Sequence, residues 1–198
     1  MKAVAVITGR AVPLDRADVD TDQIIPSDWL KRVERTGFGR GLFSAWRDDR
    51  SFVLNDERFV GASILVAGAN FGIGSSREHA VWALADYGFE AVISPQFADI
   101  FFSNCTKEGL VPVTLDEADV ATLLRAVEAQ PALELTIDVS RRLVEAPEIG
   151  FRSTFELDQF TVDRLVNGWD DIGLTLRHAD ALDVFESARP SYLPTARA

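Results

Sequence analysis

Residues 63–88 read SILVAGANFGIGSSREHAVWALADYG, an apolar run followed by a glycine-rich loop and a helical pattern. The apolar run at 63–67 predicts a buried strand, and apolar residues at helical spacing predict a helix over 77–87 that ends at Gly88. Similar runs predict strands at 4–8, 90–94, 110–114 and 133–139, with helices at 97–107 and 117–128. This alternation of strands and helices predicts an α/β domain.

The two flanks of this core follow other patterns. A polar, aromatic and glycine-rich stretch at about 28–42 predicts a long functional loop, either a mobile lid or an ordinary surface loop. Further elements are expected beyond Pro147, at 151–157 for a strand and at 160–166 and 172–185 for helices. We therefore expect one domain over 1–188 and a loose tail over 189–198.

Composition limits the classes of partner and compartment. The chain has 198 residues, 47% of them hydrophobic, and its 31 acidic and 20 basic residues give a net charge of −11. This charge argues against nucleic-acid and anionic-membrane partners, and no segment has the length and apolarity of a membrane span. The single Cys105 can form no internal disulfide and cannot hold a metal cluster unaided, which favours the reducing cytoplasm.

The glycine-rich loop predicts an anion site in this otherwise negative chain. Gly74 and its neighbours let the backbone approach a ligand, and the start of the following helix attracts negative charge. Arg77 adds a planar fork suited to a carboxylate, and Ser75 and Ser76 place two hydroxyls beside it. A serine helped by amides and a cation can remove a proton next to a carboxylate. Alternatively, one of the serines simply caps the helix.

Nucleotide sites fit this loop poorly. A phosphate-binding P-loop would end in a lysine, and the sequence has none between Lys31 and Lys107. A dinucleotide site would have an acidic residue after the next strand, where Pro95 and Gln96 stand instead. Both nucleotide interpretations are therefore disfavoured.

Two further groups of residues are candidates for the same site. Asp20 and Asp22, with Thr21 between them, could accept hydrogen bonds, carry protons or bind a metal, or could form an ordinary polar turn. His79 lies two residues after Arg77 and could orient a neighbour or serve a structural role. Basic and polar residues of the long loop could also contact an anion, namely Lys31, Arg32 and Thr36.

These residues bear a resemblance to one family. The chain resembles the small subunits of bacterial 3-isopropylmalate dehydratase, also called isopropylmalate isomerase, in the aconitase superfamily. The matching segments are DTDQIIP at 20–26, LKR at 30–32, TGFG at 36–39, NFG at 70–72, GSSREHA at 74–80, FF at 101–102, Asn104, and GL at 109–110. The GSSREHA run is the most specific of them.

The resemblance implies a fold, a partner and a cofactor. The fold would be the swivelling β/β/α domain found at the C-terminus of aconitases, with a layered or barrel-like core and flanking helices. A separate large subunit would form a heterodimer or larger assembly with it and carry an iron-sulfur cluster whose open iron acts as a Lewis acid. This chain itself is expected to bind no metal and no cofactor.

The resemblance also implies a reaction and residue roles. The complex would interconvert 2-isopropylmalate and 3-isopropylmalate through 2-isopropylmaleate in leucine biosynthesis. Ser75 would move the proton, Ser76 and Arg77 would hold a carboxylate of this small dicarboxylate, and His79 would lie behind them. The acidic turn at 20–22 would border the site. In the long loop, Trp29, Leu30 and Phe38 are candidates for contact with the isopropyl group, and Lys31, Arg32 or Arg35 for contact with the other carboxylate.

Two other functions remain open from the sequence. In the first, the chain is the small subunit of a related hydro-lyase for another hydroxy-diacid, such as homoaconitate, a citraconate-type substrate or dimethylmalate. A non-catalytic module could keep the glycine and serine loop only to bind an anion.

Overall fold

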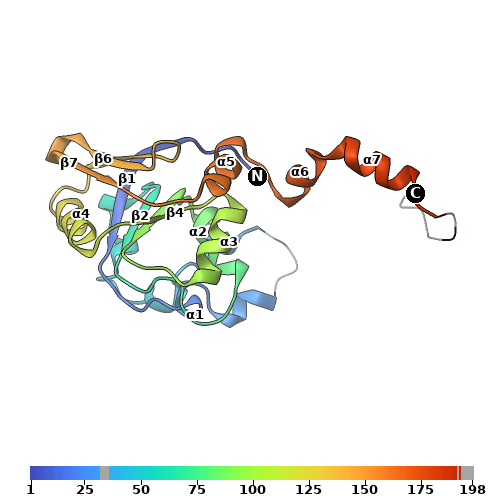
Figure 1. The fold of residues 1–198 in the computed structure, drawn as a ribbon. Coiled ribbons are helices and arrows are strands. Elements are labelled where there is room, and N and C mark those ends of the chain that lie inside the picture. Colours follow the sequence, from blue (N-terminus) through green and yellow to red (C-terminus); the bar gives the residue numbers. More distant parts are fainter. Residues whose placement is uncertain (32–35, 191, 193–198) are drawn as a thin grey trace.

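A computed structural model describes residues 1–31, 36–190 and 192 of the chain. Its framework is a curled seven-stranded mixed sheet in the order β4-β3-β2-β1-β5-β6-β7 (Figure 1). The strands are β1 (Val6–Leu14), β2 (Ile64–Ala67), β3 (Ala91–Ser94), β4 (Val111–Thr114), β5 (Glu134–Asp138), β6 (Leu143–Ala146) and β7 (Phe151–Thr154). The helices are α1 (Thr21–Ile24), α2 (Glu78–Tyr87), α3 (Asp99–Glu108), α4 (Glu117–Ala129), α5 (Gln159–Asn167), α6 (Asp171–Leu176) and α7 (Ala179–Ser187).

Strand β1 joins the two halves of the sheet. Its first half pairs antiparallel with β5, and its second half, from Ala11 to Leu14, pairs parallel with β2. Strands β2 and β3 are buried along their whole length, as expected for parallel strands covered on both faces. Helices α2 and α3 cover one face and α4 covers the other (Figure 1). The expected α/β fold with a layered core and flanking helices is confirmed.

Most expected elements form with small shifts of their ends, but three expectations were wrong. The first strand continues through Pro13 to Leu14, because this part pairs with β2 although proline donates no hydrogen bond. Strand β6 was not expected. The helix expected at 172–185 is two helices, separated where the guanidinium of Arg177 stacks 3.9 Å from the ring centre of Trp169.

Helix ends follow the sequence signals in part. Gly88 ends α2 in the left-handed conformation at φ 116°, as expected. Asp116 occupies the position before α4, but its side chain forms no capping hydrogen bond.

The long loop has local structure where it is described. Short 3-10 helices span Ser27–Lys31 and Phe38–Gly41, and the second of them packs against α2. Phe38 is fully buried there, so this part of the loop belongs to the core. Movement of the loop as a lid stays a prediction.

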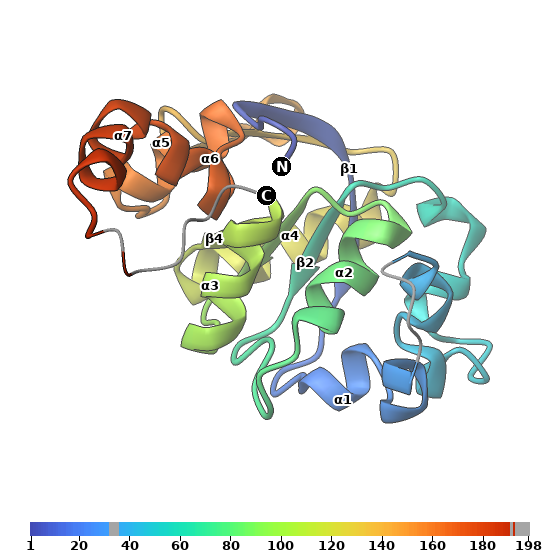
Figure 2. The same cartoon turned by 90° about the vertical axis from the view of Figure 1, so that its right-hand side faces the viewer.

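The last two helices leave the body of the protein. Figure 1 shows α6 and α7 extending away from the sheet on the side of α2 and α3, and Figure 2 views the molecule from that end. The body ends at α5, whose Leu165 carbonyl accepts a 2.8 Å hydrogen bond from the amide of Val4. Among the helices that the structure describes, none is both long and apolar enough for a membrane span.

The cap of α5 gives a pH-dependent prediction. Hydrogen bonds from the side chain and backbone N–H of Thr161 lower the pKa of Asp158 from 3.8. A lowered folded-state pKa means that the ionised cap stabilises the fold above the unfolded pKa and loses this effect as pH falls through the folded pKa. We expect Asp158→Ala to reduce the free energy of unfolding by about 1 kcal/mol at neutral pH.

Urea denaturation at several pH values measures this effect. The deficit of Asp158→Ala should shrink below about pH 4, as the wild-type carboxylate becomes protonated. Glu156→Ala, which removes a nearby exposed carboxylate outside the cap, is the control. Two results would contradict the role of the ionised cap. One is a loss of unfolding free energy in Asp158→Ala that does not change with pH, and the other is an equal loss in Glu156→Ala.

Candidate functional site

Three loops meet at the carboxyl ends of parallel strands β1, β2 and β3. The loop after β2 bonds to both neighbours: the amide of Gly72 donates to the Val19 carbonyl at 2.8 Å, and the amide of Phe71 donates to the Gln96 carbonyl at 2.9 Å. Buried Ser94 donates its hydroxyl to the Gly68 carbonyl at 2.7 Å. Ligands of open α/β sheets bind at this edge of the sheet.

Glycine is required where the central loop crosses α3. Gly72 has φ 78°, and a Cβ atom built on it would lie 2.2 Å from the Cγ atom of Phe101. The backbone therefore touches the phenylalanine ring directly. This contact sets the distance between the glycine loop and the start of α3.

A cavity of about 220 Å³ opens between the glycine loop and the start of α3. Its lining from the loop is Gly72, Gly74, Ser75, Ser76 and Arg77, and from elsewhere Thr21, Ala98, Asp99, Ile100 and Phe101. The structure thus brings both candidate serines, Arg77, Gly74 and Thr21 into one cavity, as the sequence motifs had suggested.

Neither serine caps the following helix. Helix α2 begins at Glu78, Arg77 holds the position before it, and no side chain caps it. Both serines are exposed, and their hydroxyls form no hydrogen bond with the residues that the structure describes. The capping alternative is therefore wrong, and both hydroxyls can contact a ligand.

The acidic turn positions the serine loop. The hydroxyl of Thr21, a residue only 2% exposed, donates a 2.9 Å hydrogen bond to the carbonyl of Ser75. Asp20 caps α1: its carboxylate accepts from the amide of Gln23 at 2.7 Å, and the Gln23 side chain accepts from the Asp20 amide at 3.0 Å. The polar-turn interpretation of Asp20 is thus correct at the local level, and Asp20 also lies beside Gly74.

Arg77 is held by the same turn. Its Nη1 atom donates to the carboxylate of Asp22 and lies 3.5 Å from the Ile25 carbonyl. The side chain of Arg77 is 18% exposed, whereas that of Asp22 is 56% exposed. The Nε and Nη2 atoms have no partner in the described part of the chain, so they remain free to bind a carboxylate.

The other candidates lie outside this cavity. His79 packs on α2 between Phe38, at 5.3 Å between ring centres, and Trp82, at 4.6 Å. Lys31 is exposed and lies 3.5 Å from Asp28, and Thr36 is exposed. Two further candidates fall outside the described residues, namely Arg32 and Arg35.

The apolar candidates of the long loop are less accessible than expected. Phe38 is fully buried, and Trp29 and Leu30 pack against the core. In contrast, Ile100 is 55% exposed at the rim of the cavity. The order of the elements could have identified Asp99 and Ile100. Both begin α3, which follows β3, and the carboxyl ends of β2 and β3 lie at the same edge of the sheet.

Cys105 does not contribute to the site. Its thiol is fully buried in α3, and burial raises its pKa well above the usual value. A buried neutral thiol is a packed small side chain. In the described ranges, no three histidine, cysteine or acidic residues are grouped as metal ligands would be.

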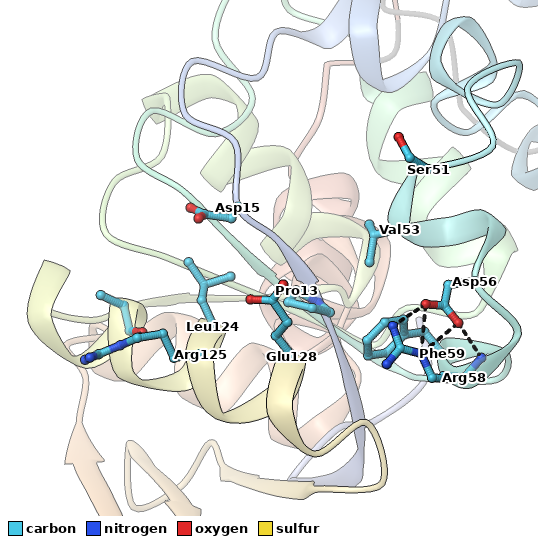
Figure 3. Close-up of a pocket in the computed structure, with 11 residues that line it drawn as sticks. Pro13, Asp15, Ser51, Val53, Asp56, Arg58, Phe59, Leu124, Arg125 and Glu128 are labelled. Carbon is cyan, nitrogen blue, oxygen red and sulfur yellow. Dashed lines mark hydrogen bonds and ion pairs between the residues drawn. The ribbon is translucent and has the colours of Figure 1, made fainter.

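A larger cavity lies elsewhere. It has a volume of about 450 Å³ and lies between α4 and the segment around Asp56 (Figure 3). The charges on one side of it are already paired, since Arg58 Nη2 lies 2.6 Å from an Asp56 carboxylate oxygen. The smaller cavity is the better candidate of the two. It holds the hydroxyls of Ser75 and Ser76 beside Arg77, of which only Nη1 has a partner among the described residues.

Comparisons with known proteins identify the family of the chain. Residues 1–118 match the family model of the aconitase C-terminal domain, and residues 171–195 match that of the C-terminal domain of the 3-isopropylmalate dehydratase small subunit. The chain is 62% identical to the 3-isopropylmalate dehydratase small subunit of Parafrankia sp., over 98% of this chain and 99% of the relative. The corresponding protein of Rubrobacter xylanophilus is 56% identical over 98% of each chain.

A solved structure agrees as well. The 3-isopropylmalate dehydratase structure from Methanocaldococcus jannaschii superposes with a TM-score of 0.69 and 25% sequence identity. The superposition covers 91% of this chain and 99% of the other. The likeness therefore extends over nearly the whole of both proteins.

The contact at Gly72 can be tested by substitution. Gly72→Ala should lose about 1–3 kcal/mol of stability from its left-handed backbone and a further amount of about 1–3 kcal/mol from the clash with Phe101. Gly88→Ala is the matched control, because Gly88 also has positive φ but a Cβ atom built on it would meet nothing within 4 Å. Chemical denaturation measures both variants. Equal losses would mean that crowding against Phe101 does not constrain the loop.

Proposed function

Because the chain belongs to the family of 3-isopropylmalate dehydratase small subunits in the aconitase superfamily, we propose that it is the small subunit of a hydro-lyase in leucine biosynthesis. With a large subunit, it would interconvert 2-isopropylmalate and 3-isopropylmalate by losing and regaining water, with 2-isopropylmaleate as the intermediate. The observation that carries this proposal is the cavity itself, where free serine hydroxyls lie beside a guanidinium with two unpaired nitrogen atoms.

Ser75 is the group proposed to move the proton. Dehydration requires a base to take the proton from the carbon next to a carboxylate, while the hydroxyl group of the neighbouring carbon leaves as hydroxide and takes up a second proton to become water. The Ser75 alkoxide would accept that proton and return it during hydration. The positive end of α2 and the guanidinium of Arg77 would both stabilise the alkoxide.

Arg77 is proposed to bind a substrate carboxylate. Asp22 and the Ile25 carbonyl engage Nη1, which leaves Nε and Nη2 as a fork for two carboxylate oxygens. Ser76 would donate a further hydrogen bond. The Thr21 hydroxyl supports this arrangement through the Ser75 carbonyl and is therefore a positioning group.

The remaining parts of the substrate would contact the cavity rim and the long loop. Ile100 and Phe101 offer an apolar wall for the isopropyl group. The second carboxylate would bind basic residues of the loop, with Lys31 and Arg32 as the proposed partners. His79 would support Phe38 and the loop from behind.

The cofactor is proposed to belong to the large subunit. Clusters are held by several cysteine thiolates, whereas this chain has the single buried Cys105. The cluster would act as a Lewis acid for the substrate hydroxyl. We propose that the complex is a cytoplasmic heterodimer or a larger assembly.

Substitution of the proposed base tests the reaction. In the complex reconstituted with its large subunit under anaerobic conditions, Ser75→Ala should lower kcat about 100- to 10,000-fold. KM should change little, because the carboxylate contacts stay. Ser103→Ala, which alters an exposed serine on α3 outside the cavity, is the control. The absorbance of 2-isopropylmaleate measures turnover, and undiminished turnover would remove Ser75 as the base.

Substitution of the guanidinium tests substrate binding. Arg77→Lys keeps the charge but removes the planar fork, so KM should rise roughly 10- to 100-fold, as expected for the loss of a charge-assisted hydrogen bond. Arg141→Lys, on the exposed surface away from the cavity, should leave KM unchanged. A KM unchanged by Arg77→Lys would show that another residue holds the carboxylate.

A further inference from the structure

The segment after α5 forms an exposed arm, defined here as residues 170–190. All residues from 175 to 190 are exposed, and no other described segment of the chain has so long an unbroken run of exposed residues. Five large apolar side chains are exposed to water: Ile172 is 71% exposed, Leu176 62%, Leu182 38%, Val184 71% and Phe185 65%. A single exposed apolar residue is ordinary, but five on one short arm mark an interaction site.

The base of the arm is fixed to the body. Arg164, only 8% exposed, donates through Nε to the Trp169 carbonyl at 3.1 Å and through Nη2 to the Asp171 carboxylate at 2.7 Å. Asp170 caps α6 by accepting from the amide of Gly173 at 2.7 Å. These contacts direct the start of the arm away from the sheet, on the side of α2 and α3 (Figures 1 and 2).

Helix α7 has two distinct faces. At 100° per residue, Val184, Phe185 and Leu182 fall on one side together with small alanines. Asp180, Asp183 and Glu186 recur every three residues on the other side, and their carboxylates have no partner among the described residues. A helix of nine residues is marginal alone in water, so its apolar face needs a covering surface.

The charges on the arm argue against a second copy of this chain as that surface. The arm carries five carboxylates and two arginines, and the whole chain has a net charge of −11. Pairing two arms would bring like charges together. The favoured partner is a protein with an apolar groove bordered by lysine or arginine.

The two family matches point to which protein this partner is. The aconitase C-terminal domain model covers residues 1–118, whereas residues 171–195 match a separate model named for the dehydratase small subunit. The arm is thus characteristic of a domain that exists as its own chain and must find its partner in solution. We infer that the apolar face of the arm docks into a basic-rimmed groove of the large subunit, an inference that rests on the proposed function.

A double alanine variant tests this docking. Val184→Ala/Phe185→Ala removes the apolar contacts while keeping good helix-forming residues, so any loss of binding reports the contacts themselves. Val60→Ala is the matched control, since Val60 is 63% exposed and lies outside the arm. Sedimentation under anaerobic conditions measures the affinity of each variant for the large subunit, and the self-association of each variant alone.

We expect the double variant to bind the large subunit about tenfold or more weakly, while the control binds as the wild type does. Reversal of Asp180, Asp183 and Glu186 to lysine should also weaken binding and reduce its salt dependence. Equal binding by the double variant, or loss of self-association alone, would overturn the inference. A wild-type chain that does not bind would overturn both the docking and the proposed partnership.

Turnover separates the docking from the reaction. Arm-dependent binding in a complex that does not convert isopropylmalate would support the docking and overturn only the proposed substrate. Normal turnover together with arm-independent binding would overturn only the docking.

Discussion

Backbone hydrogen bonds between neighbouring loops hold the site together. The loop after β2 has no regular partner strand at 71–73, yet it bonds to the loop after β1 through Val19 and to the loop after β3 through Gln96. Phe101 packs directly on the Gly72 backbone. These contacts fix the backbone of the glycine loop at the edge of the sheet. They therefore determine where Ser75 and its neighbours lie in the cavity.

The electrostatics of the site depend on one partly occupied arginine. The Arg77–Asp22 ion pair has an exposed acidic partner, and such pairs contribute at most about 1 kcal/mol to stability. Its value is therefore geometric: one side of the guanidinium is held and the other is presented to the cavity. In a chain with a net charge of −11, this arrangement places a local positive charge at the cavity without a general positive field.

The sequence predicted which residues of the glycine loop lie together better than it predicted the opposite wall of the cavity. Ser75, Ser76 and Arg77 could be predicted because glycines, hydroxyls and a guanidinium adjoin in sequence at the end of a clear strand. The cavity wall at Ile100 was missed, because its own segment carries no such motif and only its place after the next parallel strand brings it beside the glycine loop. That proximity comes from the Phe71–Phe97 bridge, which is a tertiary contact.

The fold shows the same division. Strands β2 and β3 were predicted from their apolar runs, since both faces are buried. The second half of β1 was not predicted because it contains Pro13, yet it pairs in parallel with β2. Local sequence patterns thus identify strands that are buried on both faces. They miss a segment such as the second half of β1, which is a strand because it pairs with β2.

We propose that the active site for isopropylmalate is shared between two chains, with the serine and arginine loop on this chain and the cluster on the large subunit. Anaerobic mixing of the wild-type chain with its cluster-loaded large subunit, followed by the absorbance of 2-isopropylmaleate, tests it directly. We predict turnover in the mixture and none with either chain alone. An intact, cluster-loaded complex that leaves isopropylmalate unchanged would contradict the claim.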